Sequence, residues 1–459
     1  MKKIFRRTAH SVYFVGIGGI GMSALARYFL RLGSNRRTNP KWSIAGMDAV
    51  ESDITRELRK EGAHIDIGHK ASNIGRDVGL VVYNRAITKD KPELAAARKA
   101  KIPIVPYARV LGEITRGHTT IAITGSHGKT TTTALAGMLL VKNNFDPTVF
   151  VGTKLTEFGG KNIRIGKSPY LVLEADDFGA AFLEYAPQVS IVTNIDREHM
   201  DFYKTFGNVQ KAFLAFLSNT RDGGVLIVNR DDKPLYGLRG KIAALAKKKH
   251  LAVRWYSLNH AAAKKIKKVL KISGRHNLSN ALAIYELGLL LKIPKPNILR
   301  SLGSYQGAWR RMERRGTLRG MRGVPVFDDY AHHPTEIKAT LQAFHERFPR
   351  SPIICVFQPH QAKRLQALFK EFTAAFDDAD ALVLLPIYAV KGRDERAKYD
   401  SQKLATAVAR RLPHKNVVYL PQPSGLKSKL ASIAASFKQK PVIVMMGAGD
   451  IAALTENLI

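Results

Sequence analysis

Short apolar runs alternate with segments of helical periodicity along almost the whole chain, and this alternation restricts the fold more than any other feature. In the first part, helical patterns at 22–32 and 91–101 separate apolar runs that we interpret as strands at 12–15, 43–46, 80–83 and 104–105. A helix between two strands returns the chain to the same end of the sheet, so the strands pair in parallel. The sequence therefore predicts an α/β fold with parallel sheets covered by helices.

The same alternation continues towards the C-terminus and predicts more than one domain. Further strands are expected at 120–123, 170–173, 189–193, 224–229, 324–327, 353–357, 381–385, 417–420 and 442–446. At 459 residues the chain is too long for one ordinary domain. We expect three consecutive α/β domains, at residues 1–107, 108–312 and 313–459.

The chain is strongly basic, with 73 Lys and Arg residues against 37 Asp and Glu residues and a formal net charge of +36. Such an excess attracts anions such as phosphorylated small molecules, nucleic acids or anionic membranes. The basic residues are spread along the chain without a nucleic-acid-binding motif, so we expect no specific nucleic-acid partner. The one cysteine, Cys355, lies in an apolar run, which indicates a buried structural thiol rather than a nucleophile.

The N-terminus superficially resembles a signal peptide, because the basic segment 1–7 precedes the largely apolar segment 11–26. Glycines at turn-like spacing interrupt the apolar segment, and Arg27 and Arg31 follow it, so a strand, a turn and a helix explain it better. No other segment is apolar over the length of a membrane span. We therefore expect a cytoplasmic protein without membrane insertion.

A glycine-rich turn follows the first expected strand and leads directly into a helical pattern. Its residues are Gly16-Ile17-Gly18-Gly19-Ile20-Gly21. Glycines let the backbone approach a pyrophosphate, and the helix N-terminus stabilises the negative charge. Asp48 follows the second strand, where a ribose-binding carboxylate would lie. Glycines at a tight structural turn explain the same residues equally well.

A second turn lies between an expected strand and a helical pattern at 133–140, and it reads Thr124-Gly125-Ser126-His127-Gly128-Lys129-Thr130-Thr131. Here backbone amides and Lys129 would hold phosphates, and the Thr130 hydroxyl would reach Mg²⁺. Ile123 stands where the common phosphate loop has its first glycine. The strand and helix around the turn still favour a nucleotide site over a coincidental match.

Carboxylates and an imidazole follow two further strands of this segment. One strand ends in Glu174-Ala175-Asp176-Asp177, and the other in Asn194-Ile195-Asp196-Arg197-Glu198-His199-Met200-Asp201. Carboxylates at such positions are often only helix caps, and a lone histidine is often structural. Three strand ends that carry Lys129 with Thr130, Glu174 and His199 together predict a metal–triphosphate site.

Polar clusters also mark the last part of the chain. Asn277 would cap a helix expected at 278–291, and Arg310 and Arg311 belong to either a solvated charge run or an anion clamp. Two more clusters end strands, namely Asp328-Asp329-Tyr330-Ala331-His332-His333-Pro334-Thr335 and Phe357-Gln358-Pro359-His360, which Arg364 follows. The paired histidines have no cysteine and no spaced third ligand beside them, so they do not predict zinc.

Taken together and in this order, the motifs strongly resemble those of the Mur ligase family. The resemblance runs from about residue 12 to residue 449, where the chain closes on Gly447-Ala448-Gly449-Asp450-Ile451. It is strongest to the members that use ATP to join L-alanine to the carboxylate of UDP-N-acetylmuramate. It implies a UDP-binding Rossmann-like domain, a central P-loop ATPase domain and a C-terminal Rossmann-like domain that contacts the amino acid and ATP.

The resemblance also implies a role for each motif. The UDP-sugar would lie on Gly16, Gly18, Gly19, Ile20, Gly21 and Asp48. ATP would lie on Gly125, Ser126, His127, Gly128, Lys129, Thr130, Thr131, Asn277, Asn280, Asp329 and Tyr330, with Mg²⁺ on Thr130, Glu174 and His199. Catalysis, through an acyl phosphate that the amino acid attacks, would depend on Lys129, His199, Arg311, His332, His360 and Arg364.

Several residues depart from the family pattern. Asn84 and Arg85 lie where a Ser-Ser-Ala-Ile stretch is usual, and Asp177 begins an Asp-Phe-Gly stretch where Glu-Ser-Asp is usual. Gln361 replaces a common arginine, and Leu214 falls where some sister ligases carry a carbamylated lysine, so we expect no such lysine. The changes at Asn84, Arg85 and Gln361 leave the details of both substrates open, and the amino-acid preference with them.

Three other functions also remain open on the sequence. A ligase that attaches a whole tripeptide to the same UDP-sugar would share most of the motifs. A nicotinamide-dependent dehydrogenase would explain the first glycine turn but not the second turn, Glu174 or His199. A basic P-loop protein that binds nucleic acid would explain the charge but not the two Rossmann-like flanks.

Overall fold

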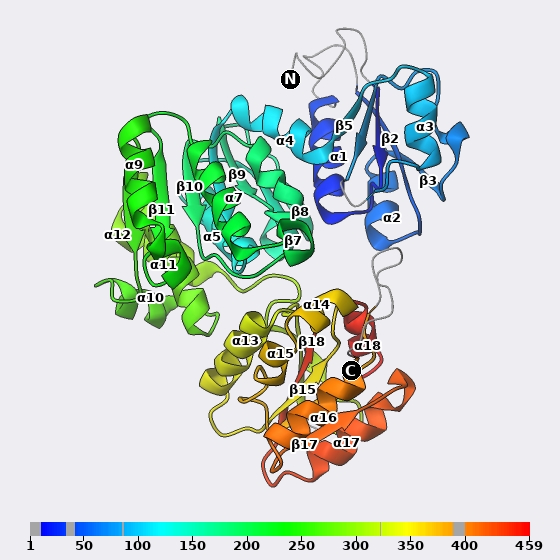
Figure 1. The fold of residues 1–459 in the computed structure, drawn as a ribbon, viewed down its shortest axis with the longest axis vertical. Coiled ribbons are helices and arrows are strands. Elements are labelled where there is room, and N and C mark those ends of the chain that lie inside the picture. Colours follow the sequence, from blue (N-terminus) through cyan, green and yellow to red (C-terminus); the bar gives the residue numbers. More distant parts are fainter. Residues whose placement is uncertain (1–10, 34–41, 85–86, 322, 389–399) are drawn as a thin grey trace. The chain divides into compact units, whose positions relative to one another are not determined.

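The computed structural model describes residues 11–33, 42–84, 87–321, 323–388 and 400–459 (Figure 1). The basic segment 1–7 and Arg85, on which two expectations depend, lie outside the described residues. The chain divides into two compact units, one of Met1–Val269 with Ser279–Gly303 and the other of Leu270–Leu278 with Ser304–Ile459. Each unit is described by itself below.

The first sheet has five parallel strands in the order β3-β2-β1-β4-β5. Its strands are β1 (Ser11–Val15), β2 (Ser43–Asp48), β3 (His64–Ile67), β4 (Leu80–Tyr83) and β5 (Ile104–Pro106). The helices between them are α1 (Ile20–Gly33), α2 (Asp53–Lys60) and α3 (Pro92–Lys99), and α4 (Tyr107–Arg116) follows β5. Every residue of β1 is buried, because this strand lies in the middle of a sheet that helices cover. The predicted parallel sheet is confirmed, and β3 is an addition to it.

The second sheet has seven strands in the order β12-β11-β10-β6-β9-β7-β8. The strands are β6 (Thr119–Thr124), β7 (Thr148–Leu155), β8 (Lys161–Arg164), β9 (Tyr170–Glu174), β10 (Val189–Val192), β11 (Val225–Asn229) and β12 (Ala252–Tyr256). Its helices are α5 (Lys129–Lys142), α6 (Met200–Tyr203), α7 (Phe206–Ser218), α8 (Lys233–Gly237), α9 (Arg239–Lys249), α10 (Ala263–Val269), α11 (Arg275–Leu290) and α12 (Lys295–Ser304). The predicted parallel sheet is confirmed, and the edge strand β8 is an addition that pairs antiparallel with β7.

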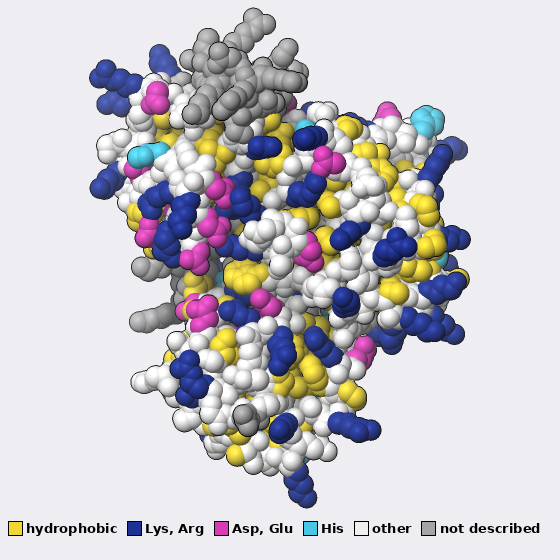
Figure 2. Space-filling view, turned by 180° about the vertical axis from the view of Figure 1, so that it is seen from behind, with side chains coloured by type: hydrophobic (Ala, Val, Ile, Leu, Met, Phe, Trp, Pro, Cys, Tyr) yellow, Lys and Arg dark blue, Asp and Glu magenta, His cyan; other side chains and the backbone are white. Residues whose placement is uncertain are grey.

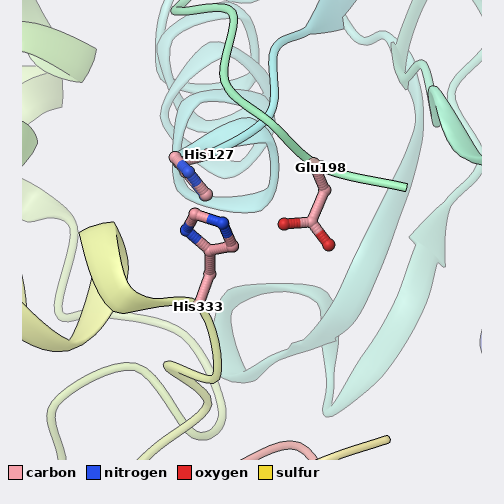
Figure 3. A group of neighbouring side chains, drawn as sticks. All are labelled: His127, Glu198 and His333. Carbon is pink, nitrogen blue, oxygen red and sulfur yellow. The ribbon is translucent and has the colours of Figure 1, made fainter. Parts of the chain in front are cut away.

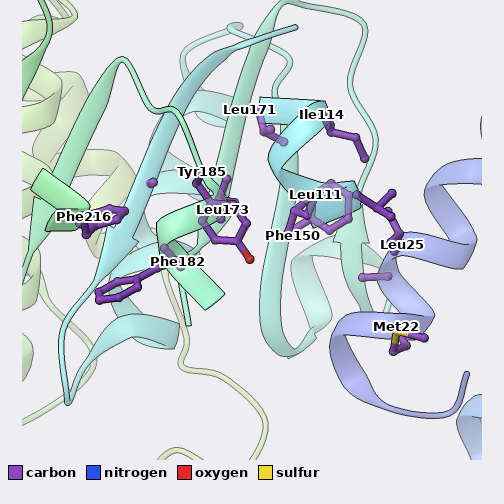
Figure 4. Packing of buried hydrophobic residues seen from close by; sticks show 14 of the residues in the cluster. Met22, Leu25, Leu111, Ile114, Phe150, Leu171, Leu173, Phe182, Tyr185 and Phe216 are labelled. Carbon is purple, nitrogen blue, oxygen red and sulfur yellow. The ribbon is translucent and has the colours of Figure 1, made fainter. Parts of the chain in front are cut away.

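One apolar core joins the first two sheets. Figure 4 shows Met22 and Leu25 of α1 near Leu111 of α4 and Phe150 of β7, within a single cluster of buried side chains. Beside this cluster, the buried guanidinium of Arg27 donates to Asn162 Oδ1 at 2.7 Å. Apolar burial and a satisfied buried hydrogen bond therefore hold the two sheets in one unit.

The third sheet has six strands in the order β13-β14-β18-β15-β16-β17, and β13 is antiparallel to β14. Its strands are β13 (Glu313–Thr317), β14 (Pro325–Asp329), β15 (Ile353–Phe357), β16 (Ala381–Leu384), β17 (Asn416–Tyr419) and β18 (Val442–Met446). Its helices are α13 (Pro334–Arg347), α14 (Ala362–Ala367), α15 (Phe369–Thr373), α16 (Ser401–Arg411), α17 (Leu426–Ala435) and α18 (Ile451–Glu456). Cys355 is fully buried in β15, where burial raises the pKa of its thiol.

The positive charge is distributed as the sequence suggests. Figure 2 shows Lys and Arg side chains scattered over the face drawn there, with acidic side chains between them. Within the described residues, no helix combines the length and the apolar character that crossing a bilayer requires.

Candidate functional site

Three strands of the second sheet carry polar residues at their carboxyl ends, and these ends lie side by side. Strand β6 lies between β10 and β9, and all three run parallel. The turn of residues 124–131 follows β6, Glu174 ends β9, and Asn194 follows β10 shortly after its last residue. The connection after β6 leads to β7 and the connection after the neighbouring β10 leads to β11, in opposite directions along the sheet, and such a switch point is where open α/β sheets bind ligands.

The turn after β6 has the backbone geometry of a phosphate loop. Gly125 has φ +145°, and a Cβ there would lie 2.0 Å from Thr193 Oγ1, so no other residue fits. Helix α5 begins at Lys129, and not at residue 133 as its apolar pattern suggested. The four β-branched threonines after Lys129 have weak helix propensity and hide the first turn from a pattern analysis. The amide groups of that first turn are not used within the helix.

Lys129 lies at the centre of this turn. Its Nζ donates to Gly125 O at 2.6 Å, to Ser126 O at 3.1 Å and to Asp177 Oδ1 at 2.8 Å. Burial alone would lower the pKa of Lys129, but the carboxylates of Asp177, Asp176 and Glu174 raise it above its usual value. The lysine is therefore charged at neutral pH, as the binding of phosphate requires.

Glu174 lies against the first turn of α5. Its Oε1 accepts the Thr130 hydroxyl at 2.9 Å, and its Oε2 accepts the amide of Gly152 at 2.7 Å. Burial raises the pKa of this carboxyl. A hydroxyl and a carboxylate in contact are the hard oxygen ligands that Mg²⁺ prefers, so Thr130 and Glu174 fit such an ion.

The loop after β10 forms hydrogen bonds with the phosphate loop. Asn194 Oδ1 accepts the amide of His127 at 2.8 Å, and Asp196 Oδ2 lies 2.9 Å from His127 Nε2. Figure 3 shows His127 at the start of α5 and Glu198 on the loop beyond β10. His333, also drawn there, precedes α13 in the second unit.

His199 stands beside two carboxylates of the segment after β9. One ligand atom each of Asp176, Asp177 and His199 lies within 4.8 Å of the other two. The ring of Phe178 meets the imidazole edge-on, with centroids 5.0 Å apart. His199 therefore lies with Asp176 and Asp177, whereas the sequence predicted it in a metal set with Thr130 and Glu174, and Asp177 was expected only as a departure from the family pattern.

The first glycine turn is held by Asp48. The carboxylate of Asp48, at the end of β2, accepts the amide of Gly18 at 2.8 Å, and a Cβ on Gly18 would lie 2.8 Å from the same oxygen. Gly16 and Ile17 donate their amides to Met47 O, each at 2.9 Å, before α1 begins at Ile20. The turn thus presents its backbone beside a carboxylate that already serves as a structural acceptor.

Asn277 does not cap a helix, and that expectation is wrong. Helix α11 already begins at Arg275, so Asn277 lies in its first turn, and its side-chain amide donates to Ser273 O at 2.7 Å. A Cβ on Gly128 would lie 2.6 Å from Asn280 Oδ1. The glycine before Lys129 thus leaves room for the side chain of Asn280.

In the second unit, Asp329 ends β14, Tyr330 follows it, and the two residues organise the arginine pair. Buried Asp329 accepts the amides of Met312 and Ala331 at 2.8 and 2.9 Å, and burial raises its pKa. The Tyr330 ring has the guanidinium carbons of Arg310 and Arg311 5.0 and 5.2 Å from its centroid. The buried Arg310 donates to Gly447 O at 2.5 Å, which ties this pair to the loop after β18.

The histidines of the second unit lie at the same edge, because β14, β18 and β15 are neighbours. The rings of His332 and His360 have centroids 6.1 Å apart, and His360 stacks on Tyr388. Arg364, in α14, reaches His360 O at 3.5 Å, which is a marginal contact. Gln358 connects the loops by donating to Asp450 at 2.8 Å and accepting from the amide of Ile451 at 3.2 Å.

Four residues that organise these sites were named in the sequence analysis but not included among the predicted site residues. They are Asp177, Asn194, Asp196 and Arg310. Each lies in or beside a motif that had been recognised, but its partner is distant in sequence, and no spacing rule predicts that pairing. The one indication in the sequence of a site role for Asp177 was its position after a strand, beside Glu174.

The comparisons with known proteins agree with this architecture. Three family models match in order: the Mur ligase family catalytic domain at residues 11–119, the Mur ligase middle domain at 123–287 and the Mur ligase glutamate ligase domain at 310–449.

Individual relatives match over nearly the full length. A UDP-N-acetylmuramate–L-alanine ligase of Desulfatibacillum aliphaticivorans is 37% identical, with 99% of both chains covered. One of Anaeromyxobacter dehalogenans is 38% identical, over 99% of this chain and 98% of the relative. The crystal structure of the UDP-N-acetylmuramate–alanine ligase of Thermotoga maritima matches with a TM-score of 0.75 and 26% identity, over 97% of both chains.

The motifs, the three sheets and the full-length relatives point to one family. The resemblance read from the sequence is thereby confirmed. This chain belongs to the Mur ligase family.

Proposed function

We propose that the chain is an ATP-dependent ligase that forms an amide between the carboxylate of UDP-N-acetylmuramate and L-alanine, in the synthesis of peptidoglycan precursors. The observation that carries the proposal is Lys129, held among the carbonyls of a phosphate loop, beside the paired Thr130 and Glu174. The full-length relatives that bear this name support the choice of substrates. Since ATP and UDP-sugars are cytoplasmic metabolites, we also propose that the enzyme works in the cytoplasm.

The first step needs a charged, preorganised site for the triphosphate. Backbone amides of residues 125–129 and the Lys129 ammonium bind the β- and γ-phosphates of ATP, with His127 and Thr131 on the same loop. Mg²⁺ on Thr130 and Glu174 supplies positive charge to the phosphate oxygens when it is bound. The substrate carboxylate attacks the γ-phosphate in line, which gives an acyl phosphate and ADP.

The second step needs positioning more than acid–base chemistry. The amine of L-alanine attacks the acyl carbon, and the tetrahedral intermediate expels phosphate to leave the amide. We assign Arg311 to the charge on the transferring phosphate, and His332, His360 and Arg364 to the region of the amino acid and the acyl phosphate. Asn277, Asn280, Asp329 and Tyr330 are assigned to the nucleotide.

The first glycine turn is assigned to the UDP-sugar. Its residues Gly16, Gly18, Gly19, Ile20 and Gly21 offer backbone amides at the start of α1, with Asp48 beside them. We assign residues 1–107 to this substrate, 108–312 to ATP and 313–459 to the amino acid and ATP.

Phosphate release from Mg-ATP tests the proposal. Reactions contain UDP-N-acetylmuramate and one of glycine, L-alanine, L-serine or an L-Ala-γ-D-Glu-containing tripeptide, and mass spectrometry identifies the amide. We expect release that requires both the sugar and L-alanine. Preference for the tripeptide would instead assign the enzyme to recycling, and no release with any acceptor would contradict a ligase of this specificity.

A further inference from the structure

The ammonium of Lys129 has no hydrogen left for a phosphate. A lysine has three N–H donors. In this structure they are matched by three acceptors, Gly125 O, Ser126 O and Asp177 Oδ1, at 2.6, 3.1 and 2.8 Å. A phosphate that binds Lys129 must therefore take the place of one of them. The two carbonyls belong to the loop that cradles the phosphate, so Asp177 is the acceptor that can give way without changing the loop.

Asp177 loses its counter-charge when the ammonium of Lys129 moves to a phosphate. Its side chain is fully buried, and its Oδ2 has no hydrogen-bond partner among the residues that the structure describes. The backbone on both sides is fixed, because Tyr203 donates its hydroxyl to Asp177 O at 2.5 Å and Phe178 donates its amide to Asp176 Oδ1 at 3.1 Å. A buried carboxylate without a counter-charge is strongly unfavourable, which favours the binding of another cation in place of the ammonium.

Suitable ligands for that cation surround Asp177. The side chains of Asp176 and His199 each place a ligand atom within 4.8 Å of the ligand atom of Asp177 and of each other. Two carboxylates and an imidazole are acceptable ligands for Mg²⁺ or Mn²⁺. Phe178 packs edge-on against the His199 ring and so limits its rotation. The unpartnered, fully buried Oδ2 distinguishes this group from an ordinary cluster of surface acids.

We propose that Asp177 couples nucleotide binding to divalent-cation binding. The nucleotide phosphates draw Lys129 away from Asp177, and a cation held with Asp176 and His199 takes the place of the ammonium on the carboxylate. Without the cation, nucleotide binding leaves Asp177 buried and unpaired, so the metal and the nucleotide strengthen each other. The inference rests on the proposed ATP site, and Asp177 acts in it as a positioning residue for Lys129.

A thermodynamic cycle with ADP tests the coupling without any ligase activity. Calorimetry of the whole chain gives the Kd of ADP in EDTA and in saturating Mn²⁺, and the ratio of the two values is the coupling factor. For the wild type we expect a factor of about ten or more, within the usual range of coupling between two sites. In Asp177→Asn, which keeps the acceptor for Lys129 but loses the charge, we expect this factor to fall about fivefold or more. Metal-free ADP binding should become tighter in the same variant.

Two further variants keep the test decisive. His199→Asn removes a cation ligand without touching Lys129, so it should lose the coupling while metal-free ADP affinity stays at the wild-type value; this result stands even if Asp177→Asn does not fold. Asp222→Asn, on an exposed carboxylate of the same unit, should change nothing. An unchanged coupling factor in Asp177→Asn or in His199→Asn would overturn the proposal. Failure of the wild type to bind ADP at all would instead contradict the ATP site itself.

Discussion

The two glycine turns of the first unit are built on the same plan and differ in the charge beside them. Each follows a central parallel strand, β1 or β6, and each leads into the helix that covers the next strand. In the first turn, the carboxylate of Asp48 accepts the amide of Gly18. In the second turn, a largely buried lysine lies beside the carboxylates of Glu174 and Asp177. One turn offers backbone groups, and the other offers backbone groups together with movable charges.

This difference matches two kinds of phosphate chemistry. A pyrophosphate that is only held needs amide groups and a helix N-terminus, which the first turn provides. A phosphate that is transferred needs cations that follow the developing charge. Gly16 to Gly21 therefore suit a substrate anchor, whereas Gly125 to Thr131 suit the reacting nucleotide. The following predictions test this difference in role between the two turns, from the largest expected effect to the smallest.

Lys129→Ala should reduce turnover by about 10³-fold or more, because it removes the cation nearest the transferring phosphate. Circular dichroism should show a folded protein, although Asp177 then lacks its counter-charge and thermal unfolding should occur at a lower temperature. The matched control is Lys142→Ala, an exposed lysine at the other end of α5, which should keep full activity. Substantial turnover in Lys129→Ala would show that the charge at the second turn is not what distinguishes the two turns.

Gly18→Ala should raise the KM for UDP-N-acetylmuramate about tenfold and leave the KM for ATP unchanged. The added Cβ would lie 2.8 Å from Asp48 Oδ2 and 3.2 Å from Thr55 Cγ2, so the backbone at the turn has to move. Steady-state kinetics with each substrate varied in turn measures both constants. Gly237→Ala, where a Cβ meets nothing within 4 Å, is the control. An equal rise in both KM values would mean that the first turn is not specific to the sugar nucleotide.

Both turns were predictable from the sequence, and so was their position at the sheet edge. Gly125 and Lys129 follow an apolar run, and the carboxyl ends of neighbouring parallel strands meet at one edge, so Glu174 and His199 had to lie near them. The family's order of motifs then identified the whole architecture.

The contacts that tune the site were not predictable in the same way. Lys129 and Asp177 are 48 positions apart, and their pairing depends on how the segment after β9 bends back. The hairpin of β7 and β8 was missed, and its edge strand β8 is short and carries the polar residues Lys161, Asn162 and Arg164. Asn277 was misplaced because the start of α11 carries polar residues, whereas the pattern rested on apolar ones. The periodicity of apolar residues indicates which residues are buried. The pairing of Lys129 with Asp177, the hairpin and the start of α11 depend on tertiary contacts instead.

Asp48→Ala should have a smaller effect than Gly18→Ala, a rise of about fivefold in the KM for UDP-N-acetylmuramate. The substitution removes one hydrogen bond to the Gly18 amide, which is worth about 1 kcal/mol, but adds no steric conflict. The kinetics described for Gly18→Ala measure it directly. If Asp48 also binds the ribose, the rise should clearly exceed that of Gly18→Ala, and the order of the two effects therefore separates a purely structural carboxylate from one that touches the substrate.

The last prediction concerns how the buried carboxyl groups around the second turn affect the free energy of unfolding. Asp232 accepts the amide of Ile195, which follows β10, and burial, with the nearby carboxylate of Asp196, raises its pKa from 3.8 to about 6. A carboxyl whose pKa is raised on folding binds its proton more tightly in the native state. Its contribution to stability is therefore fully present below about pH 4 and is lost as the pH rises through about 6.

Asp232→Asn removes this titration but keeps a side-chain acceptor for the amides. The free energy of unfolding of the wild type should therefore decrease relative to that of Asp232→Asn between pH 4 and pH 7, by about 1–3 kcal/mol. Urea unfolding of both proteins across this range measures the difference, with Asp222→Asn as a control on an exposed carboxylate. Parallel stability curves would mean that Asp232 titrates normally. The burial of this carboxyl near the phosphate loop would then not lower the free energy of unfolding.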